Sequence, residues 1–373
     1  MSNDLAFISP EAGADGGVRL LLVGPMPPPI NGQSVVMSHI ASKLLPKFPL
    51  MRVCDGSAGD SKAWFRPAVK VARSARAMWS IATADVVYIA VKAGKGMWLT
   101  TAAAGLARLL GANIFLHHHS YAYVRERKLR MVALVRSAGP GAHHIVLSQS
   151  MSTQLRRVMP EIQGLLVVGN AGLIDKNLLG LPLKADFSDL VLGHLSELTP
   201  AKGVGEVVEL AIALNRSGVR ARLIVGGPDA KGVPRRQLDR AASELGEMFE
   251  YRGLLTGEAK LRFFDDISHF IFPSSYANEA VPLVLYEAMA AGAVCVATRQ
   301  GSIPEQLDGS PSVLAENSDT FVAEALPALS DAVVSNSVSA ECRRAYTIAL
   351  EESEKQLSAL SKLLAGPSHC KES

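Results

Sequence analysis

Residues 269–298, HFIFPSSYANEAVPLVLYEAMAAGAVCVAT, decide the fold class, because they read as a strand, a helix and a second strand. The two strands are short apolar runs at 269–274 and 293–298. Between them we expect a helix at about 281–291. Pro282 suits its first turn, where a missing N–H removes no bond, and Gly292 suits its end. A helix that joins two successive strands predicts a parallel sheet.

The same alternation runs along the rest of the chain. Further strands are expected at 16–24, 85–91, 113–119, 143–148, 189–196 and 221–227, and helices at 34–45, 98–111, 204–218 and 340–364. Ser34 is the expected N-cap of the first of these helices. The pattern predicts an α/β chain with parallel sheets in doubly wound domains.

The length of 373 residues suggests roughly two domains, which would leave a cleft between them. A polar, proline-containing stretch at 175–189 separates two series of strands and helices. We therefore expect an N-terminal domain at 1–183, a C-terminal domain at 184–342, and a final helix and tail at 343–373.

Composition excludes several classes of protein. A hydrophobic content of 48% with 20% charged residues is that of a packed globular chain and excludes a disordered or fibrous one. No apolar run approaches the ~18 residues that span a bilayer, and the N-terminus lacks a signal-peptide pattern, so we expect a cytoplasmic protein. The 4 cysteines have no C-x-x-C spacing, which favours reduced thiols over a disulfide framework or a zinc site.

Charge is divided unevenly along the chain. Residues 1–180 hold 20 basic and 9 acidic residues, whereas residues 181–373 hold 18 and 26. The basic half is expected to face an anionic partner such as lipid headgroups, a phosphorylated acceptor or nucleic acid.

The segment KAWFRPAVKVARSARAMWS at 62–80 carries this charge without one acid and with interleaved aromatic residues, and RERKLR at 125–130 adds to it. Such a segment suits the surface of an anionic membrane, where each cation contributes about 1 kcal/mol. The alternative is a solvated helix face over a buried apolar stripe. No recognised nucleic-acid motif is present, so we expect no nucleic acid partner. If the acceptor is lipid-linked, we expect peripheral contact of this segment with the cytosolic membrane face.

Two glutamates, Glu279 and Glu287, flank the start of the central helix. Eight helical residues rise roughly 12 Å, about the length of a diphosphate with a sugar at either end. The first-turn N–H groups and the helix dipole favour phosphate, and carboxylates accept hydrogen bonds from sugar hydroxyls. The alternative is structural: Glu287 pairs with a basic residue in the core, and Glu279 is a solvated cap.

Three further stretches carry candidate residues. In LGHLSELTPAKGV (192–204), Lys202 precedes a helix and could hold a diphosphate. In GPMPPPINGQS (24–34), Gly32 lies where backbone approaches a ligand, although neither a dinucleotide fingerprint nor a P-loop is present. In HHHS (117–120), neighbouring histidines on a strand point to opposite faces, so one or two substrate contacts are expected rather than a metal site.

Together these stretches resemble the retaining glycosyltransferases of family 4. The matching segments are GPMPPPINGQS, LHHHS, GHLSELTPAKGV, NEAVPLVLYEAMAAG and ATRQGSIPE, in the family's order over nearly the whole chain. The resemblance implies the GT-B fold, with two Rossmann-like domains that face a cleft and a C-terminal helix that crosses back to the first domain. It implies sugar transfer from a UDP- or GDP-sugar to a glycan or lipid-linked acceptor, with retention, in polysaccharide or lipopolysaccharide synthesis.

The resemblance also implies residue roles. Glu279 meets hydroxyls of the transferred sugar, Lys202 holds the diphosphate, and His119 lies near the reacting sugar; these are the expected catalytic residues. The expected donor-binding residues are Gly32, Gly193, His194, Lys202, Leu255, Glu279, Ala280, Val281, Leu283 and Glu287. Among them, Glu287 meets the ribose and Leu255 the base, the latter through its backbone.

One departure from the family concerns the diphosphate. The family commonly has Gly-Arg before the Lys-Gly pair, but here His194 follows Gly193. A neutral imidazole cannot replace a bidentate guanidinium, so Lys202 holds the diphosphate alone or another arginine reaches in.

The sequence has no D-x-D motif, so we expect neither a metal nor another cofactor. Two alternatives to a transferase remain open at this point. One is a nucleotide-sugar epimerase of GT-B fold, and the other is a non-catalytic subunit that binds nucleotide-sugar.

Overall fold

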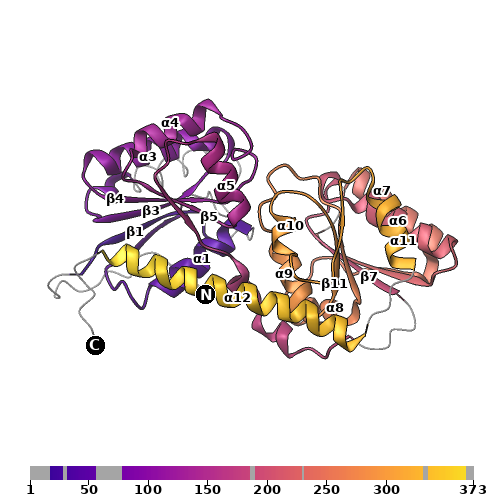
Figure 1. Cartoon of the computed structure of the whole chain (residues 1–373). Coiled ribbons are helices and arrows are strands. Elements are labelled where there is room, and N and C mark those ends of the chain that lie inside the picture. Colours follow the sequence, from indigo (N-terminus) through magenta and orange to yellow (C-terminus); the bar gives the residue numbers. More distant parts are fainter. Residues whose placement is uncertain are drawn as a thin grey trace. The chain divides into compact units, whose positions relative to one another are not determined.

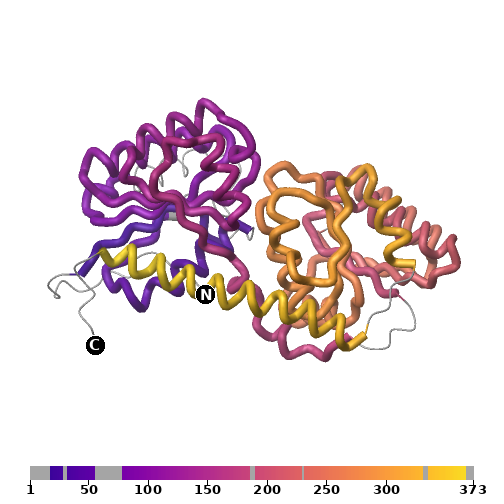
Figure 2. The backbone as a smooth tube through the Cα atoms, in the orientation of Figure 1, coloured from indigo at the N-terminus to yellow at the C-terminus, as the bar shows by residue number. Residues whose placement is uncertain are grey.

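The computed structural model describes residues 17–27, 32–55, 78–184, 190–228, 231–330 and 335–366. The chain divides into two compact units, Met1–Leu173 with Ser353–Ser373, and Ile174–Glu352 (Figure 2). The boundary between the two units, after Leu173, comes earlier in the sequence than the expected boundary between residues 183 and 184. Most of the basic segment at 62–80 lies outside the described residues, which resume at Met78.

The first unit is built on a parallel sheet with the strand order β2-β1-β3-β4-β5-β6. Its strands are β1 (Leu20–Gly24), β2 (Arg52–Asp55), β3 (Val86–Val91), β4 (Asn113–His118), β5 (His143–Val146) and β6 (Gly164–Val167). The strands expected at 16–24, 85–91, 113–119 and 143–148 are confirmed. The two strands at the sheet edges, β2 and β6, were not predicted, because both are short and only partly buried.

Helices cover both faces of this sheet. They are α1 (Gly32–Leu44), α3 (Met97–Leu109), α4 (Leu129–Ala138) and α5 (Gln149–Val158). Figure 1 shows α3 and α4 together on one face and α1 on the other. The N-cap prediction for Ser34 is wrong, since α1 is already helical at Gly32 and Ser34 lies buried inside it.

The last helix, α12 (Asn336–Ala365), contributes to both units. Its later residues Leu360 and Leu364 are buried in the first unit's core with residues of α1 and β1. Nearby, the Ser353 hydroxyl donates to the Gly169 carbonyl at 2.7 Å, and the Gly169 N–H donates to the Gln356 side chain at 2.8 Å. The expected return of the C-terminal helix to the first unit is confirmed.

The second unit has a second parallel sheet, with the order β12-β11-β10-β7-β8-β9. Its strands are β7 (Leu190–Leu195), β8 (Ala221–Gly226), β9 (Phe249–Tyr251), β10 (His269–Phe272), β11 (Val294–Thr298) and β12 (Val313–Ala315). The chain runs outward from β7 to β9 and then returns to the other side of β7 with β10. Ligands bind at such a reversal point, outside the carboxyl ends of the strands.

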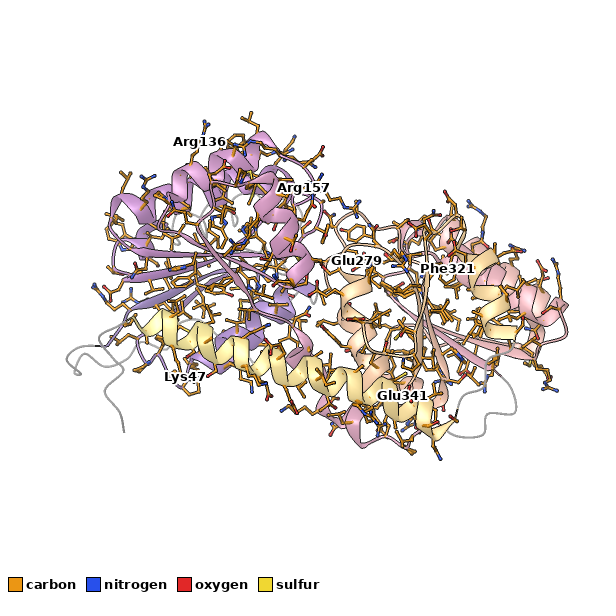
Figure 3. All side chains as sticks on the ribbon, viewed as in Figure 1. Lys47, Arg136, Arg157, Glu279, Phe321 and Glu341 are labelled. Atoms are coloured by element: carbon orange, nitrogen blue, oxygen red, sulfur yellow. The ribbon has the colours of Figure 1, made fainter. Side chains whose placement is uncertain are left out.

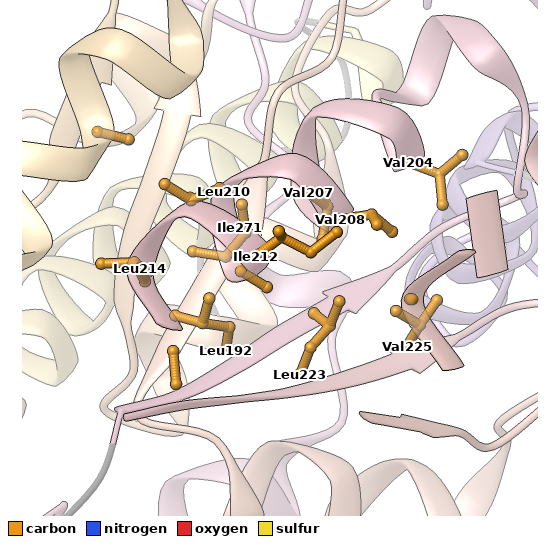
Figure 4. Close-up of a cluster of buried hydrophobic side chains, with 14 of the residues drawn as sticks. Leu192, Val204, Val207, Val208, Leu210, Ile212, Leu214, Leu223, Val225 and Ile271 are labelled. Atoms are coloured by element: carbon orange, nitrogen blue, oxygen red, sulfur yellow. The ribbon is translucent and has the colours of Figure 1, made fainter. Parts of the chain in front are cut away.

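The second unit's helices are α6 (Val204–Arg216), α7 (Val233–Leu245), α8 (Gly257–Asp266), α9 (Leu283–Ala290), α10 (Ile303–Gln306) and α11 (Phe321–Ser330). A cluster of buried leucine, valine and isoleucine side chains joins α6 to β7, β8 and β10 (Figure 4). Fully burying one such side chain stabilises the fold by about 1.5–3 kcal/mol.

The helix expected at 281–291 is found at α9, slightly shorter than expected. Pro282 occupies the N-cap rather than the first turn. Gly292 follows the helix in the left-handed region, with φ +76°, as its position suggested. Across the described residues, no helix combines the length and the apolar character needed to cross a membrane.

The loop after β11 packs directly on the backbone of Glu279. Gly301 has φ +59°, and a Cβ at this position would overlap the carbonyl oxygen of Glu279. The neighbouring Ser302 N–H donates to the Ala280 carbonyl at 3.1 Å. A glycine is therefore required at residue 301 both for its backbone angle and for this close approach.

We predict that Gly301→Ala lowers stability and shifts Glu279. The left-handed conformation alone costs an alanine about 1–2 kcal/mol, and the overlap with the Glu279 carbonyl adds to it. Gly309→Ala is the matched control, since Gly309 has φ +73° with no atom within 4 Å of the added Cβ. Urea unfolding of both variants measures the difference, and equal losses for the two would show that the Glu279 contact is unimportant.

Candidate active site

Lys202 lies at the carboxyl end of β7, beside the reversal point of the second sheet. It is the last residue of a short helical turn, η4 (Pro200–Lys202), between β7 and α6. The next residue, Gly203, has φ +81°, and a Cβ there would overlap the backbone of Pro273, which follows β10. This close approach places Lys202 against the segment that leads from β10 to Glu279.

Lys202 and Glu279 form an ion pair inside this site. The Lys202 ammonium contacts Glu279 Oε2, and the Ser274 hydroxyl donates to the same oxygen at 3.0 Å. The ammonium also lies 5.3 Å from the centre of the Phe272 ring and 4.9 Å from that of Tyr276. Two aromatic faces and a carboxylate thus hold one cation at the ends of β7 and β10.

Glu279 is buried, with 8% of its surface exposed, and Figure 3 labels it among the side chains of the second unit. The alternative interpretation of Glu279 as a solvated cap is therefore wrong.

Glu287 lies inside α9 and is also buried. Lys260 of α8 donates to its Oε1 at 2.6 Å. Burial raises the pKa of the Glu287 carboxyl, and the nearby Lys260 ammonium opposes that rise. The structural alternative for Glu287, a basic partner in the core, is thus found. Such a pair leaves the second carboxylate oxygen for another hydrogen bond.

The start of α9 lies between the two glutamates in the sequence. Ala280 and Val281 are buried, and Leu283 is the first helical residue. No described side chain caps this helix start. The Leu285 N–H donates to the Pro282 carbonyl at 3.2 Å, whereas the N–H groups of Leu283 and Val284 precede the first bond of the helix, which makes the position suitable for an anion.

His194 and Gly193, at the end of β7, serve the protein's own packing. The His194 ring is fully buried; its Nδ1 lies 2.9 Å from the Ile271 carbonyl oxygen and its Nε2 lies 2.8 Å from the Ser196 hydroxyl. Burial lowers the pKa of His194 to about 4, so the ring is neutral at pH 7 and both nitrogens are occupied. A side chain at Gly193 would overlap Ile267, so close packing explains this glycine.

Leu255 follows β9 and is buried, with its side chain beside Gly226 at the end of β8. Its expected backbone contact with a base stays a prediction.

Two expected site residues, Gly32 and His119, belong to the first unit. Gly32 opens α1, and no atom of the described residues lies within 4 Å of an added Cβ there. His119 follows β4, and neither of its ring nitrogens has a hydrogen-bond partner within the described residues, although both are buried. Burial lowers the pKa of His119 to about 3, so the imidazole is neutral. A neutral ring with two unused nitrogens can donate to one polar group and accept from another.

The other two adjacent histidines are paired inside the protein. Nδ1 of His117 lies 2.6 Å from the Tyr88 hydroxyl, and Nε2 of His118 lies 2.9 Å from Nδ1 of His144. Among the described residues, no cluster of three or more His, Cys, Asp or Glu side chains is arranged to hold a metal ion.

Three site residues were not found from the sequence: Ser274, Tyr276 and Lys260. The first two lie in the same loop as Glu279, so a closer look at residues 274–278 could have suggested them. Lys260 pairs across 27 residues, and nothing in its local sequence marks that partnership.

Comparison with known proteins supports the fold and the family of the second unit. Residues 189–331 match the family model described as Glycosyl transferases group 1. Over 254 residues, 59% of this chain, the sequence is 26% identical to the putative colanic acid biosynthesis glycosyltransferase WcaL of Escherichia coli (strain K12). That match spans 62% of the relative, less than two thirds of its length.

Two solved structures are similar over most of the chain. Anabaena Alr3699/HepE in complex with UDP has a TM-score of 0.65 and 14% identity, over 92% of this chain and 100% of that one. Sucrose-phosphate synthase from Thermosynechococcus elongatus has a TM-score of 0.69 and 15% identity, over 93% of this chain and 99% of that one. The chain thus has the expected GT-B fold, and its residues 189–331 match the glycosyl transferases group 1 model.

Proposed function

We propose that this chain is a glycosyltransferase that uses a nucleotide-diphospho-sugar donor. It transfers the sugar to a glycan or lipid-linked acceptor with retention of anomeric configuration, and without a metal or another cofactor. The observation that carries the proposal is the Lys202–Glu279 ion pair next to the uncapped start of α9, at the reversal point of the second sheet. The group 1 domain and the relative's name support it, and UDP in the HepE complex favours UDP over GDP as the donor nucleotide.

The donor's diphosphate fits between the two glutamates. Its negative charge suits the Lys202 ammonium and the backbone N–H groups of Ala280 and Leu283 at the start of α9. Glu287 then accepts a hydrogen bond from a ribose hydroxyl, and Leu255 lies on the side of the base.

In the ligand-free chain, Lys202 and Glu279 satisfy each other. A bound donor replaces this pairing with two better-matched ones, because phosphate takes the ammonium and the sugar's hydroxyls donate to the freed carboxylate. The ion pair therefore keeps two buried charges compensated until the donor arrives.

The reaction breaks the bond between the sugar's anomeric carbon and a phosphate oxygen. Negative charge grows on the leaving nucleotide, where Lys202 and the α9 N–H groups stabilise it. By resemblance to the family, the acceptor hydroxyl attacks from the same face, and the leaving phosphate oxygen takes its proton. The same resemblance assigns His119 to the reacting sugar, and among the described residues its neutral ring has no hydrogen-bond partner.

The direct test is to incubate the protein with UDP-glucose or a GDP-hexose, with and without an extract of bacterial polysaccharide and lipid-linked glycan, and to analyse the nucleotides. Free UDP or GDP that rises with acceptor supports a transferase. An isomerised donor would instead identify an epimerase, and binding without turnover a non-catalytic subunit.

We predict that Lys202→Met slows nucleotide release by a factor on the order of 10²–10³, the cost of removing one group that stabilises charge in the transition state. Lys231→Met is the matched control, because Lys231 is a solvent-exposed lysine of the same unit. Release of UDP from UDP-glucose measures both variants. If Lys202→Met released UDP as fast as Lys231→Met, Lys202 would have no role in the reaction.

We also propose that the first unit contacts an anionic membrane that carries the acceptor. Its support is the excess of basic residues in 1–180 and the exposure of Trp79, which is 82% exposed at the described end of the basic segment. Aromatic side chains at such positions favour the membrane interface.

Reversal of Arg73 and Arg76, which lie outside the described residues, to glutamate is expected to lower co-sedimentation with phosphatidylglycerol vesicles. Each removed cation weakens attraction to the surface by about 1 kcal/mol. The control is the same reversal at Arg235 and Arg236, which are exposed in the second unit. Equal sedimentation of both double variants would argue against a membrane role for the basic segment.

A further inference from the structure

The ion pair between Lys260 and Glu287 joins two neighbouring helices of the second unit. Lys260 lies in the first turn of α8, and its ammonium donates to Glu287 Oε1 at 2.6 Å. The Glu287 side chain is 9% exposed, whereas that of Lys260 is 32% exposed. The Glu287 carboxylate is therefore the buried partner of the pair, and Lys260 is partly exposed to solvent.

A carboxylate buried in this way needs a compensating charge. Transfer out of water disfavours its ionised form, and this burial is the main cause of the raised pKa of Glu287. Asp175, in the segment just before η3 (Lys176–Gly180), raises it further by like-charge repulsion. Lys260 is the opposing influence, through both its charge and its hydrogen bond. Without Lys260, the pKa of Glu287 would lie higher still.

The helix that carries Lys260 is firmly held. At the other end of α8, the buried Lys184 ammonium donates to the carbonyl oxygens of Phe264 at 2.8 Å and Asp265 at 2.6 Å. Phe263 and Ile267 fill the space beside Gly193 of β7. The backbone of Lys260 is thus fixed relative to the sheet, so its ammonium holds one carboxylate oxygen in a defined direction.

The second oxygen, Oε2, receives no hydrogen bond from the described residues. Hydroxyl groups donate strongly to an ionised carboxylate oxygen, and much less well to a protonated carboxyl group. The Lys260–Glu287 pair thus leaves the second oxygen of Glu287, on α9, as a charged hydrogen-bond acceptor with a fixed orientation.

We propose that Lys260 is a positioning residue for nucleotide binding: it holds Glu287 as an oriented carboxylate whose second oxygen accepts a ribose hydroxyl. The inference rests on the proposed function, and it assigns a role to a residue outside the motifs that suggested that function. It also joins the two interpretations of Glu287, since the structural partner prepares the carboxylate for the ligand.

If the Lys260–Glu287 pair were purely structural, a different result would be expected. The pair would link α8 to α9, and its loss would lower stability without changing nucleotide affinity. A positioning role makes the nucleotide affinity of the variant depend on pH, because removal of Lys260 raises the pKa of Glu287 further and favours its protonated form as pH falls.

The binding experiment measures UDP affinity by isothermal titration calorimetry at pH 6, 7 and 8. Lys260→Met is expected to bind UDP about tenfold more weakly at pH 7, the usual effect of losing a hydrogen bond to a charged group, and more weakly still at pH 6. Lys260→Arg, which keeps the charge, is expected to remain close to the unaltered protein. Arg262→Met is the matched control on the same helix, since Arg262 pairs with the exposed Glu258 and is expected to leave UDP affinity unchanged.

A second experiment needs no nucleotide and follows urea unfolding from pH 5 to pH 8. The pKa of Glu287 in the folded protein lies above its ordinary value of 4.5. A raised pKa means that protonation of Glu287 stabilises the folded protein. This stabilisation is complete below pH 4.5 and is lost as pH rises through the folded-state pKa. Lys260→Met raises that value further, so the loss continues to higher pH. The free energy of unfolding of Lys260→Met is therefore expected to fall further below that of the unaltered protein as pH rises. The double variant Lys260→Met/Glu287→Gln has no carboxyl group at 287, so its difference from the unaltered protein is expected to lack the increase caused by the further raised pKa.

The outcomes separate the inference from the function on which it rests. If the unaltered protein binds UDP, but Lys260→Met binds it equally well at each pH, the positioning role is overturned and the proposed function stands. If the unaltered protein binds neither UDP nor GDP, the proposed function fails, and the nucleotide part of the inference fails with it. The unfolding experiment then still decides whether Lys260 keeps Glu287 ionised, and a deficit independent of pH would overturn that part too.

Discussion

Two buried carboxylates, each compensated by one lysine, set the conditions for the rest of this site. A carboxylate is expensive to bury without a cation or several hydrogen bonds. Lys202 reaches Glu279 from the turn after β7, and Lys260 reaches Glu287 from α8. Three strands, β8, β9 and β10, separate Lys202 from Glu279 in the sequence, and one strand, β10, separates Lys260 from Glu287. The return of the chain from β9 to β10, on the other side of β7, brings Lys202 close to Glu279, so this pair depends on the topology of the second sheet. The Lys260–Glu287 pair instead joins the helices that precede and follow β10.

Much of the fold was accessible from the sequence, because the central strands carry its clearest signal. β3, β4, β7, β8, β10 and β11 were all predicted to within a few residues, since strands covered on both faces are continuous apolar runs. The edge strands β2, β6, β9 and β12 were missed, because short runs with partly exposed residues resemble loops. Ser34 was assigned as a cap from its residue type, but tertiary packing extends α1 past it.

The site was less accessible, for a physical reason. Lys202 and Glu279 follow from motifs, because each lies next to a recognisable helix start. The partnership of Lys260 with Glu287 depends on how two helices pack, and the sequence carries no local mark of it. For His194, the motif suggested more than the structure shows. Its position suggested a ligand contact, yet its two ring nitrogens are hydrogen-bonded to Ile271 and Ser196 within the protein.

The sharing of α12 between both units has a consequence for the order in which the chain can fold during synthesis. Leu360 and Leu364 complete the core around β1 and α1, although they follow the whole of the second unit in the sequence. A ribosome makes residues 174–352 before it makes these leucines, so the second unit has all its parts first. The N-terminal sheet must wait with an open core until the end of α12 emerges, which makes the later unit in the sequence the earlier one to mature.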